Sequence, residues 1–175
     1  MQERITFAEL PPKLFAVMCS VEAYVNDCGF DKRLVELLRY RVSQLNGCAY
    51  CLDRHYKEGI HEGEEAIRLY SLPVWQEAPF YSDKERAALR WADAVTLITE
   101  DRTTEALVES MYAHFDKAEL ANLTLLIAQI NSWNRLAKTF AWLPGVFQPT
   151  GTPAALALTA VKEQHAPLLN VDLSQ

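Results

Sequence analysis

Two cysteines and a histidine lie three and four residues apart in the stretch "NGCAYCLDRH": Cys48, Cys51 and His55. On a helix this spacing places all three side chains on one face. A thiol near a helix N-terminus meets the positive end of the helix dipole, which stabilises thiolate over thiol, and a nearby histidine can accept the proton. Two thiols at this spacing can also close a small disulfide. The pattern indicates redox chemistry.

A glutamate on the preceding segment is a second candidate for this site. If Asn46-Gly47 reverses the chain into a helical hairpin, Glu36 lies level with position 57, about two residues or ~3 Å of helix rise from His55. Ser43 shares the polar side of that helix with Glu36. We therefore expect contacts from Glu36 through His55 to Cys51, with Ser43 lining the site.

Other functions are compatible with parts of the motif. A CxxC pair on a helix can simply be two buried small side chains. A zinc site would need the two cysteines, the histidine and a fourth ligand such as His61 or His114, but the chain has no second CxxC and no HxxxH. A c-type haem site is excluded, because Leu52 occupies the position where the CxxCH motif requires histidine. A thioredoxin-like motif is disfavoured, because the sequence lacks the βαβ pattern in which that motif occurs.

The elements that position these residues are predicted to be helices, because apolar residues recur at helical spacing almost throughout and no run of residues indicates a strand. We therefore predict an all-α fold. The first predicted helix begins at Pro11-Pro12, and the second runs from Asp31 to the break at Asn46-Gly47. The third runs from Cys48 to about Glu58, with Asn46 as N-cap and Gly59 as stop. The remaining helices are predicted from about Glu64 to Tyr70, from Ser82 to Ile98, from Thr103 or Thr104 to His114, and from Asp116 to Pro144-Gly145.

Length and composition indicate a single domain. The 175 residues divide into a helical domain, 1–147, and an extension, 148–175, that we expect to hold a short helix over 154–164 and to pack on the core or a neighbouring subunit. The net charge of −6 argues against nucleic-acid binding. No apolar run approaches the ~20 residues of a membrane span, and no secretory signal pattern is present. With only four cysteines, we expect a cytoplasmic protein.

The combined motif resembles the AhpD-like alkylhydroperoxidase branch of the carboxymuconolactone decarboxylase family. The resemblance rests on the order E-x11-C-x2-C-x3-H, on "SQLNGCAYCLDRH", and on "NSWNRLA" at residues 131–137. It spans residues 14–143 and is much more specific than CxxC alone. It implies an all-helical AhpD-like fold.

For the chemistry, the resemblance implies a two-cysteine peroxidase. Glu36 would act through His55 to deprotonate Cys51, whose thiolate would attack an organic hydroperoxide or hydrogen peroxide and become a sulfenic acid. Cys48 would then condense with it to form a Cys48–Cys51 disulfide, with no cofactor or metal. A thiol or a lipoyl-bearing partner would restore the dithiol. The family also implies a homo-oligomer, a trimer or a hexamer.

Two features depart from a simple transfer. Tyr50 stands between the cysteines where the peroxidase pattern has histidine, and a phenol with a pKa near 10 is a poor base at neutral pH. The helix dipole favours Cys48 as the more acidic thiol, whereas the spacing to His55 favours Cys51 as the attacking one. We expect Cys51 to attack.

The remaining candidates have weaker signals. Trp133 is expected in the core or a subunit contact, with a hydroperoxide pocket as the functional hypothesis. Cys19 and Cys28 are expected to be buried structural thiols, and His165 lies in the extension. The competing functions are decarboxylation of a carboxymuconolactone-type acid, which needs no cysteine pair, and a non-enzymatic helical oligomer that senses redox state.

Overall fold

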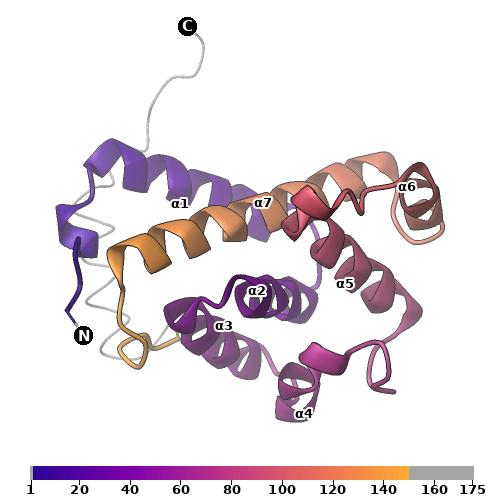
Figure 1. Cartoon of the computed structure of the whole chain (residues 1–175), viewed down its shortest axis with the longest axis horizontal. Helices are drawn as coiled ribbons and strands as arrows, with labels where there is room; N and C mark the ends of the chain where they lie inside the picture. The colour runs from indigo at the N-terminus through magenta and orange to yellow at the C-terminus, as the bar shows by residue number, and fades with distance from the viewer. Residues whose placement is uncertain (1, 150–175) are drawn as a thin grey trace, which may run out of the picture.

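The computed structural model describes residues 2–149, and in that range the chain forms helices and no strand (Figure 1). The all-α prediction is confirmed. The extension beyond residue 149, with its expected helix and His165, lies outside the described residues. The α-helices are α1 (Pro12–Asp27), α2 (Lys32–Asn46), α3 (Ala49–His61), α4 (Ala66–Tyr70), α5 (Asp83–Thr96), α6 (Glu105–Met111) and α7 (Lys117–Phe140), with 3-10 turns η1 (Phe7–Glu9), η2 (Leu72–Val74) and η3 (Ile98–Glu100).

The long helix α7 organises the core. It lies alongside α1 and also contacts α2, α3 and α5, so that one helix packs against four others (Figure 1). Its apolar side is fully buried at Leu123, Ile127 and Ile130, which recur at the predicted helical spacing. A side chain buried at this level stabilises the fold by roughly 1.5–3 kcal/mol. The packing of α7 therefore fixes the positions of α2 and α3, which carry the motif.

Side chains cap the helix starts where the sequence predicts them. Asp31 accepts hydrogen bonds from the first-turn N–H groups of α2, and Thr104 caps α6. Reciprocal capping boxes open α5 and α7 at Ser82/Glu85 and Asp116/Glu119. The predicted end of α7 is wrong. The helix ends at Phe140, where Ala141 adopts a left-handed conformation with φ 58°, before Pro144 is reached.

The turn between α2 and α3 differs from the prediction in which residue caps α3. Gly47, with φ 61°, ends α2 in a left-handed conformation, and Asn46 is the last helical residue rather than an N-cap. The first extended residue after this glycine is Cys48, so the sulfur takes the capping position. Cys48 Sγ accepts a hydrogen bond from the Cys51 N–H at 3.4 Å.

Gly59 does not stop α3, which continues to His61. The glycine is buried where α3 approaches its neighbours. A Cβ added there would lie 3.3 Å from Leu69 Cδ1 and 3.8 Å from Glu36 Cβ. The absence of a side chain thus permits the close approach of α3 to Leu69 of α4. Gly63, with φ 87°, follows the real end of the helix.

Within residues 2–149, no helix is both long enough and apolar enough to cross a bilayer.

Candidate active site

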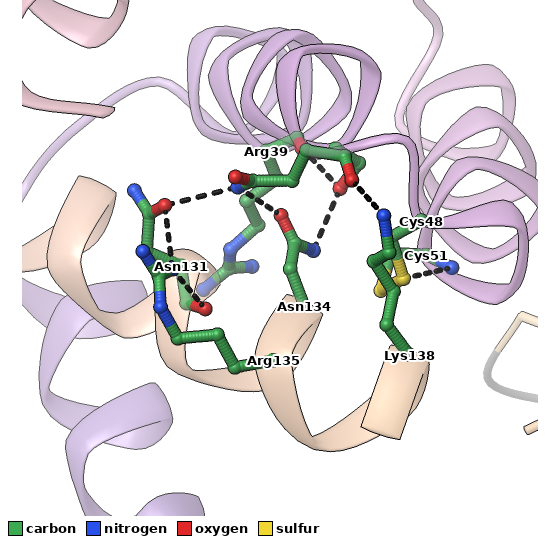
Figure 2. Close-up of a disulfide and its surroundings, with 9 residues drawn as sticks. Arg39, Cys48, Cys51, Asn131, Asn134, Arg135 and Lys138 are labelled. Carbon is green, nitrogen blue, oxygen red and sulfur yellow. Dashed lines mark hydrogen bonds between the residues drawn. A yellow bond between two sulfur atoms is a disulfide. The ribbon is translucent and has the colours of Figure 1, made fainter. Parts of the chain in front are cut away.

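Cys48 and Cys51 form a disulfide at the start of α3, with their Cα atoms 5.3 Å apart. Figure 2 shows the pair beside the end of α2. The residues are 1% and 2% exposed, so the disulfide lies inside the molecule. One turn further along α3, His55 is also buried, on the same face of the helix. Cys51 and His55 thus share one face of α3, as predicted, whereas Cys48 precedes the helix as its N-cap.

Glu36 of α2 binds His55 directly. The distance between Glu36 Oε2 and His55 Nδ1 is 2.7 Å, and the two residues are 6% and 5% exposed. An ionised carboxylate only accepts hydrogen bonds, so Nδ1 carries the proton and donates it. The lone pair of the neutral imidazole is then on Nε2. The hairpin geometry thus brings Glu36 to His55, as the position count predicts.

Arg39 is a member of this cluster that the sequence reasoning missed. It lies one helical turn after Glu36, and its Nη1 donates to Glu36 Oε1 at 2.8 Å. Its Nη2 donates to Asn26 Oδ1 of α1, also at 2.8 Å. The spacing of a glutamate and an arginine at i and i+3 was the available signal. The carboxylate of Glu36 therefore divides its two oxygens between a cation and the imidazole.

Electrostatics favour an ionised Glu36 and a neutral His55 at neutral pH. Burial alone would raise the pKa of Glu36, but the positive charges available on His55 and Arg39, together with their hydrogen bonds, lower the pKa to about 2. Burial lowers the pKa of His55 below its usual 6.5, and Glu36 offsets only part of that effect. Because Arg39 is a permanent cation, the carboxylate stays charged when the imidazole is neutral. His55 can then act as a base.

A small cavity of about 10 Å³ lies between Cys51 and His55, both of which line it. Cys48 does not line this cavity. The walls are otherwise mainly aromatic and include Tyr50 and Trp133. This volume is about what one water molecule requires. A molecule that enters this space meets the Cys51 side of the disulfide and the imidazole together.

Aromatic side chains close this cavity. Phe7, from the N-terminal turn, stacks on Trp142 with ring centroids 3.9 Å apart and lies 5.8 Å from the ring of Tyr50. Trp142 is 6.3 Å from Trp133. Burial raises the pKa of Tyr50, so the phenol remains neutral. The structure therefore places Tyr50 and Trp133 in the cavity wall, and adds Phe7 and Trp142, which carried no sequence signal for this location.

Ser43 lies in a separate polar network that joins α2 to α7. Asn134 Nδ2 donates to Ser43 Oγ at 3.1 Å, and Asn46 Nδ2 donates to Asn131 Oδ1 at 2.9 Å and Asn134 Oδ1 at 2.8 Å. Lys138 Nζ donates to the Asn46 carbonyl at 2.6 Å (Figure 2). These bonds fix the end of α2 immediately before the cysteines. Ser43 thus supports the site and does not line the cavity.

The other cysteines and histidines lie elsewhere. Cys19 and Cys28 are half-buried, so their assignment as buried thiols is wrong; Cys28 Sγ contacts the Val25 carbonyl at 3.0 Å. His61 is exposed at the end of α3, and His114 is half-buried. No group of three or more potential ligands among the described histidines, cysteines and acids could hold a metal ion.

Larger hollows on the molecule are lined mainly by polar and charged side chains. One of about 530 Å³ lies near Arg68 and Glu85 and contains none of the four motif residues. Another, of about 360 Å³, borders Glu36 and Arg39 on their solvent side. Of these hollows among residues 2–149, the small aromatic cavity is the one lined by a cysteine of the disulfide.

The fold and the site define an AhpD-like protein, and the chain belongs to the carboxymuconolactone decarboxylase family, whose model matches residues 12–94. The uncharacterized protein YdfG of Bacillus subtilis is 37% identical over 137 residues, covering 78% of this chain and 93% of YdfG. The uncharacterized protein YnjA of Escherichia coli is 32% identical over 95 residues, covering 54% of this chain and 52% of YnjA.

Solved structures share the fold. A protein of unknown function from Agrobacterium tumefaciens, described as a candidate antioxidant defence protein AhpD, is 38% identical with a TM-score of 0.79, over 83% of this chain and 100% of that chain. An uncharacterized peroxidase-related protein from Ralstonia eutropha, described as an alkylhydroperoxidase AhpD core, is 22% identical with a TM-score of 0.69, over 77% of this chain and 72% of that chain. The second supports the fold alone.

Proposed function

We propose that this protein is a thiol-dependent peroxidase that reduces organic hydroperoxides or hydrogen peroxide through a Cys48/Cys51 dithiol–disulfide cycle. The observation that carries this proposal is that Cys51 and His55 line one cavity while Glu36 holds Nδ1 of the same imidazole at 2.7 Å. The proposed nucleophile Cys51, the base His55 and the orienting carboxylate of Glu36 thus lie side by side in that order in space. A second cysteine adjacent to the nucleophile can resolve the oxidised sulfur.

In the first step, His55 Nε2 accepts the proton of the Cys51 thiol. The thiolate attacks the terminal oxygen of R–O–O–H, a sulfur–oxygen bond forms, and the O–O bond breaks with its electron pair on RO⁻. The leaving alkoxide takes the proton from His55 and departs as ROH. Cys51 is now a sulfenic acid, and the peroxide has been reduced by two electrons.

In the second step, Cys48 attacks the Cys51 sulfur. The S–S bond forms, the S–O bond breaks, and hydroxide leaves with the Cys48 proton as water. An external dithiol, such as a lipoyl group or another thiol reductant, then supplies two electrons and two protons. No separate cofactor takes part. The proposed assembly is a homo-oligomer, and the proposed catalytic domain is residues 1–147.

Cys51 is proposed as the attacking thiol on grounds of access. It lines the cavity that contains His55, whereas Cys48 does not. Cys48 Sγ caps α3 and so lies at the positive end of the helix dipole, but it does not reach the cavity. A peroxide in the cavity reaches only the sulfur that lines it. Cys48 is accordingly the resolving thiol.

Peroxide consumption and thiol mapping together test this function. Reduced protein is mixed with cumene hydroperoxide or hydrogen peroxide, residual thiols are alkylated, and products are mapped by mass spectrometry. We expect one peroxide consumed per Cys48–Cys51 disulfide formed, and repeated turnover once a dithiol reductant is added. Oxidation without turnover under any dithiol would favour a redox sensor. A reaction no faster than that of free cysteine would exclude the peroxidase.

A further inference from the structure

Two cavities meet beside Cys51. The inner one, about 10 Å³, is lined by Cys51 and His55, and the outer one, about 50 Å³, is largely aromatic. Phe7, Tyr50, Arg54 and Trp133 line both cavities. These four residues therefore stand at the junction between the reacting sulfur and the space where the body of a substrate would lie.

Two of the four have a buried side-chain N–H group without an acceptor among the described residues: Arg54 Nε and Trp133 Nε1. Trp133 is only 7% exposed. Neighbouring N–H donors do have acceptors: Trp142 Nε1 donates to the Ile5 carbonyl at 2.8 Å, and Arg54 Nη2 donates to Glu22 at 2.7 Å. A buried donor without a partner costs roughly 1–3 kcal/mol. Arg54 and Trp133 thus each keep a donor available for an acceptor atom that enters the cavities.

We propose that the Nε–H of Arg54 and the Nε1–H of Trp133 bind the substrate oxygen that leaves with the organic group. This assignment rests on the proposed peroxidase function. When the Cys51 sulfur attacks the terminal oxygen in the inner cavity, the second oxygen lies one O–O bond further out, at the junction. Negative charge develops on that oxygen as the O–O bond breaks. Prepositioned N–H donors stabilise such charge in a site from which water is excluded.

The outer cavity defines the class of substrate. Phe15 and Phe147 contribute apolar walls, and the guanidinium of Arg54 lies 5.2 Å from the ring centroid of Phe147. Glu22 also lines this cavity, where its carboxylate accepts from Arg54 Nη2 at 2.7 Å, so the ion pair adds no net charge to the walls. The occupant that fits these walls is the aryl or alkyl group of an uncharged organic hydroperoxide. A group larger than a few heavy atoms needs movement of the aromatic wall, since the volume is only about 50 Å³.

The test compares leaving groups of different basicity. Reduced parent, Trp133→Phe and Arg54→Lys proteins are reacted with tert-butyl hydroperoxide, with peracetic acid and with iodoacetamide, and the loss of the Cys51 thiol is followed by quenching and mass spectrometry. tert-Butoxide is a strong base that needs stabilisation, acetate is a weak base, and iodide is a poor acceptor. The phenylalanine variant keeps a ring, and the lysine variant keeps the charge beside Glu22. Trp91→Phe is the control, because Trp91 Nε1 donates to Thr124, away from the site.

We expect each site variant to react with tert-butyl hydroperoxide about tenfold or more slowly than the parent, with a smaller loss for peracetic acid and no change for iodoacetamide. Trp91→Phe should match the parent in all three reactions. Parent-like rates with tert-butyl hydroperoxide in both site variants would overturn the proposal and leave the N–H groups bonded to water. Equal losses in all three reactions would also overturn it, as damage to the thiol. If the parent itself fails to react with any peroxide, the peroxidase function and this assignment both fall.

Discussion

Arg39 and His55 bind different oxygens of one carboxylate: Arg39 Nη1 contacts Glu36 Oε1 at 2.8 Å, and His55 Nδ1 contacts Glu36 Oε2 at 2.7 Å. The cation keeps the carboxylate ionised inside the protein, and the ionised carboxylate holds the imidazole with Nε2 free of a proton. The basicity of His55, on α3, therefore depends on Glu36 and Arg39 of α2.

Replacing Glu36 by glutamine should slow the reaction of Cys51 about tenfold or more. The amide can still accept the Nδ1–H, but it supplies no charge to stabilise the imidazolium that forms when His55 takes the thiol proton. Iodoacetamide alkylation of Cys51 at pH 7 measures the effect. Glu58→Gln is a matched control, because Glu58 borders the hollow beyond Glu36 and has no hydrogen bond to His55. A parent-like rate in Glu36→Gln would remove Glu36 from the mechanism.

The two cysteines should fail in different ways when replaced by serine. Cys48→Ser keeps the attacking thiol, so one peroxide is consumed and a sulfenic acid accumulates at Cys51, detectable with dimedone. Cys51→Ser loses the sulfur that lines the cavity, and peroxide consumption should fall to background. The reverse result, with adduct at Cys48 in Cys51→Ser, would assign the attack to the N-capping thiol.

Stability should fall as the pH is lowered below neutrality. The pKa of Glu36 is lowered from 4.5 to about 2 in the folded state, so its contribution is complete above the unfolded pKa and disappears as the pH falls toward 2. His55 acts in the same direction, because its lowered pKa means that the unfolded chain binds the proton first. At pH 3, part of the Glu36 contribution to the unfolding free energy should therefore be lost.

Urea unfolding at pH 7, 5 and 3 measures this linkage. Glu36→Gln should be less stable than the parent at pH 7 but lose less stability on acidification. If the parent and the variant lose equal amounts between pH 7 and 3, the carboxylate does not have the lowered pKa.

Asn134→Ala should lower the unfolding free energy by about 1–3 kcal/mol, because the buried amide bonds Ser43 and Asn46 and its loss leaves those partners unsatisfied. The end of α2 should also become more mobile, seen as faster amide exchange at Gly47 and Cys48. Asn122→Ala is the control, since Asn122 accepts a hydrogen bond from the exposed Tyr24 and its loss should change stability by under about 0.5 kcal/mol. No difference between the variants would contradict a role for this network in fixing the turn.

Phe7→Ala should open the aromatic cover over the site. Its ring stacks on Trp142 and lines both cavities, so its removal exposes Cys51 of the reduced protein to bulky reagents. Alkylation by a maleimide should accelerate more than alkylation by iodoacetamide. Phe80→Ala, whose ring lies in neither cavity, should leave both rates unchanged. Equal rates in the parent and Phe7→Ala would mean that access follows another route.

Much of the scaffold could be predicted because local signals act alone. Asp31, Ser82 and Asp116 satisfy N–H groups of the helix that directly follows each of them, and apolar spacing defines the buried side of α7. The contact of Glu36 with His55 was also predictable, because a hairpin around Gly47 leaves little choice of register.

The failures have tertiary causes. Gly59 alone predicts a helix stop, but in the fold it permits the close approach of α3 to Leu69 of α4. Phe7 joins the cavity from a segment more than 40 residues before the cysteines in the chain, a distance over which periodicity carries no information. Ser43 shares a helix side with Glu36, yet α7 supplies Asn134 as its partner. Side-chain direction was predictable from the sequence, and the identity of the opposing surface was not.

The sulfur of Cys48 serves as the N-cap of α3, and this gives the first turn of the helix an influence on the reduction potential of the pair. A thiolate at that position accepts from the Cys51 N–H and meets the helix dipole more favourably than a disulfide sulfur does. Contacts that favour the reduced form shift the equilibrium toward the dithiol and raise the potential. The cap thus biases the Cys48–Cys51 disulfide toward being an oxidant that accepts electrons readily, rather than a permanent crosslink.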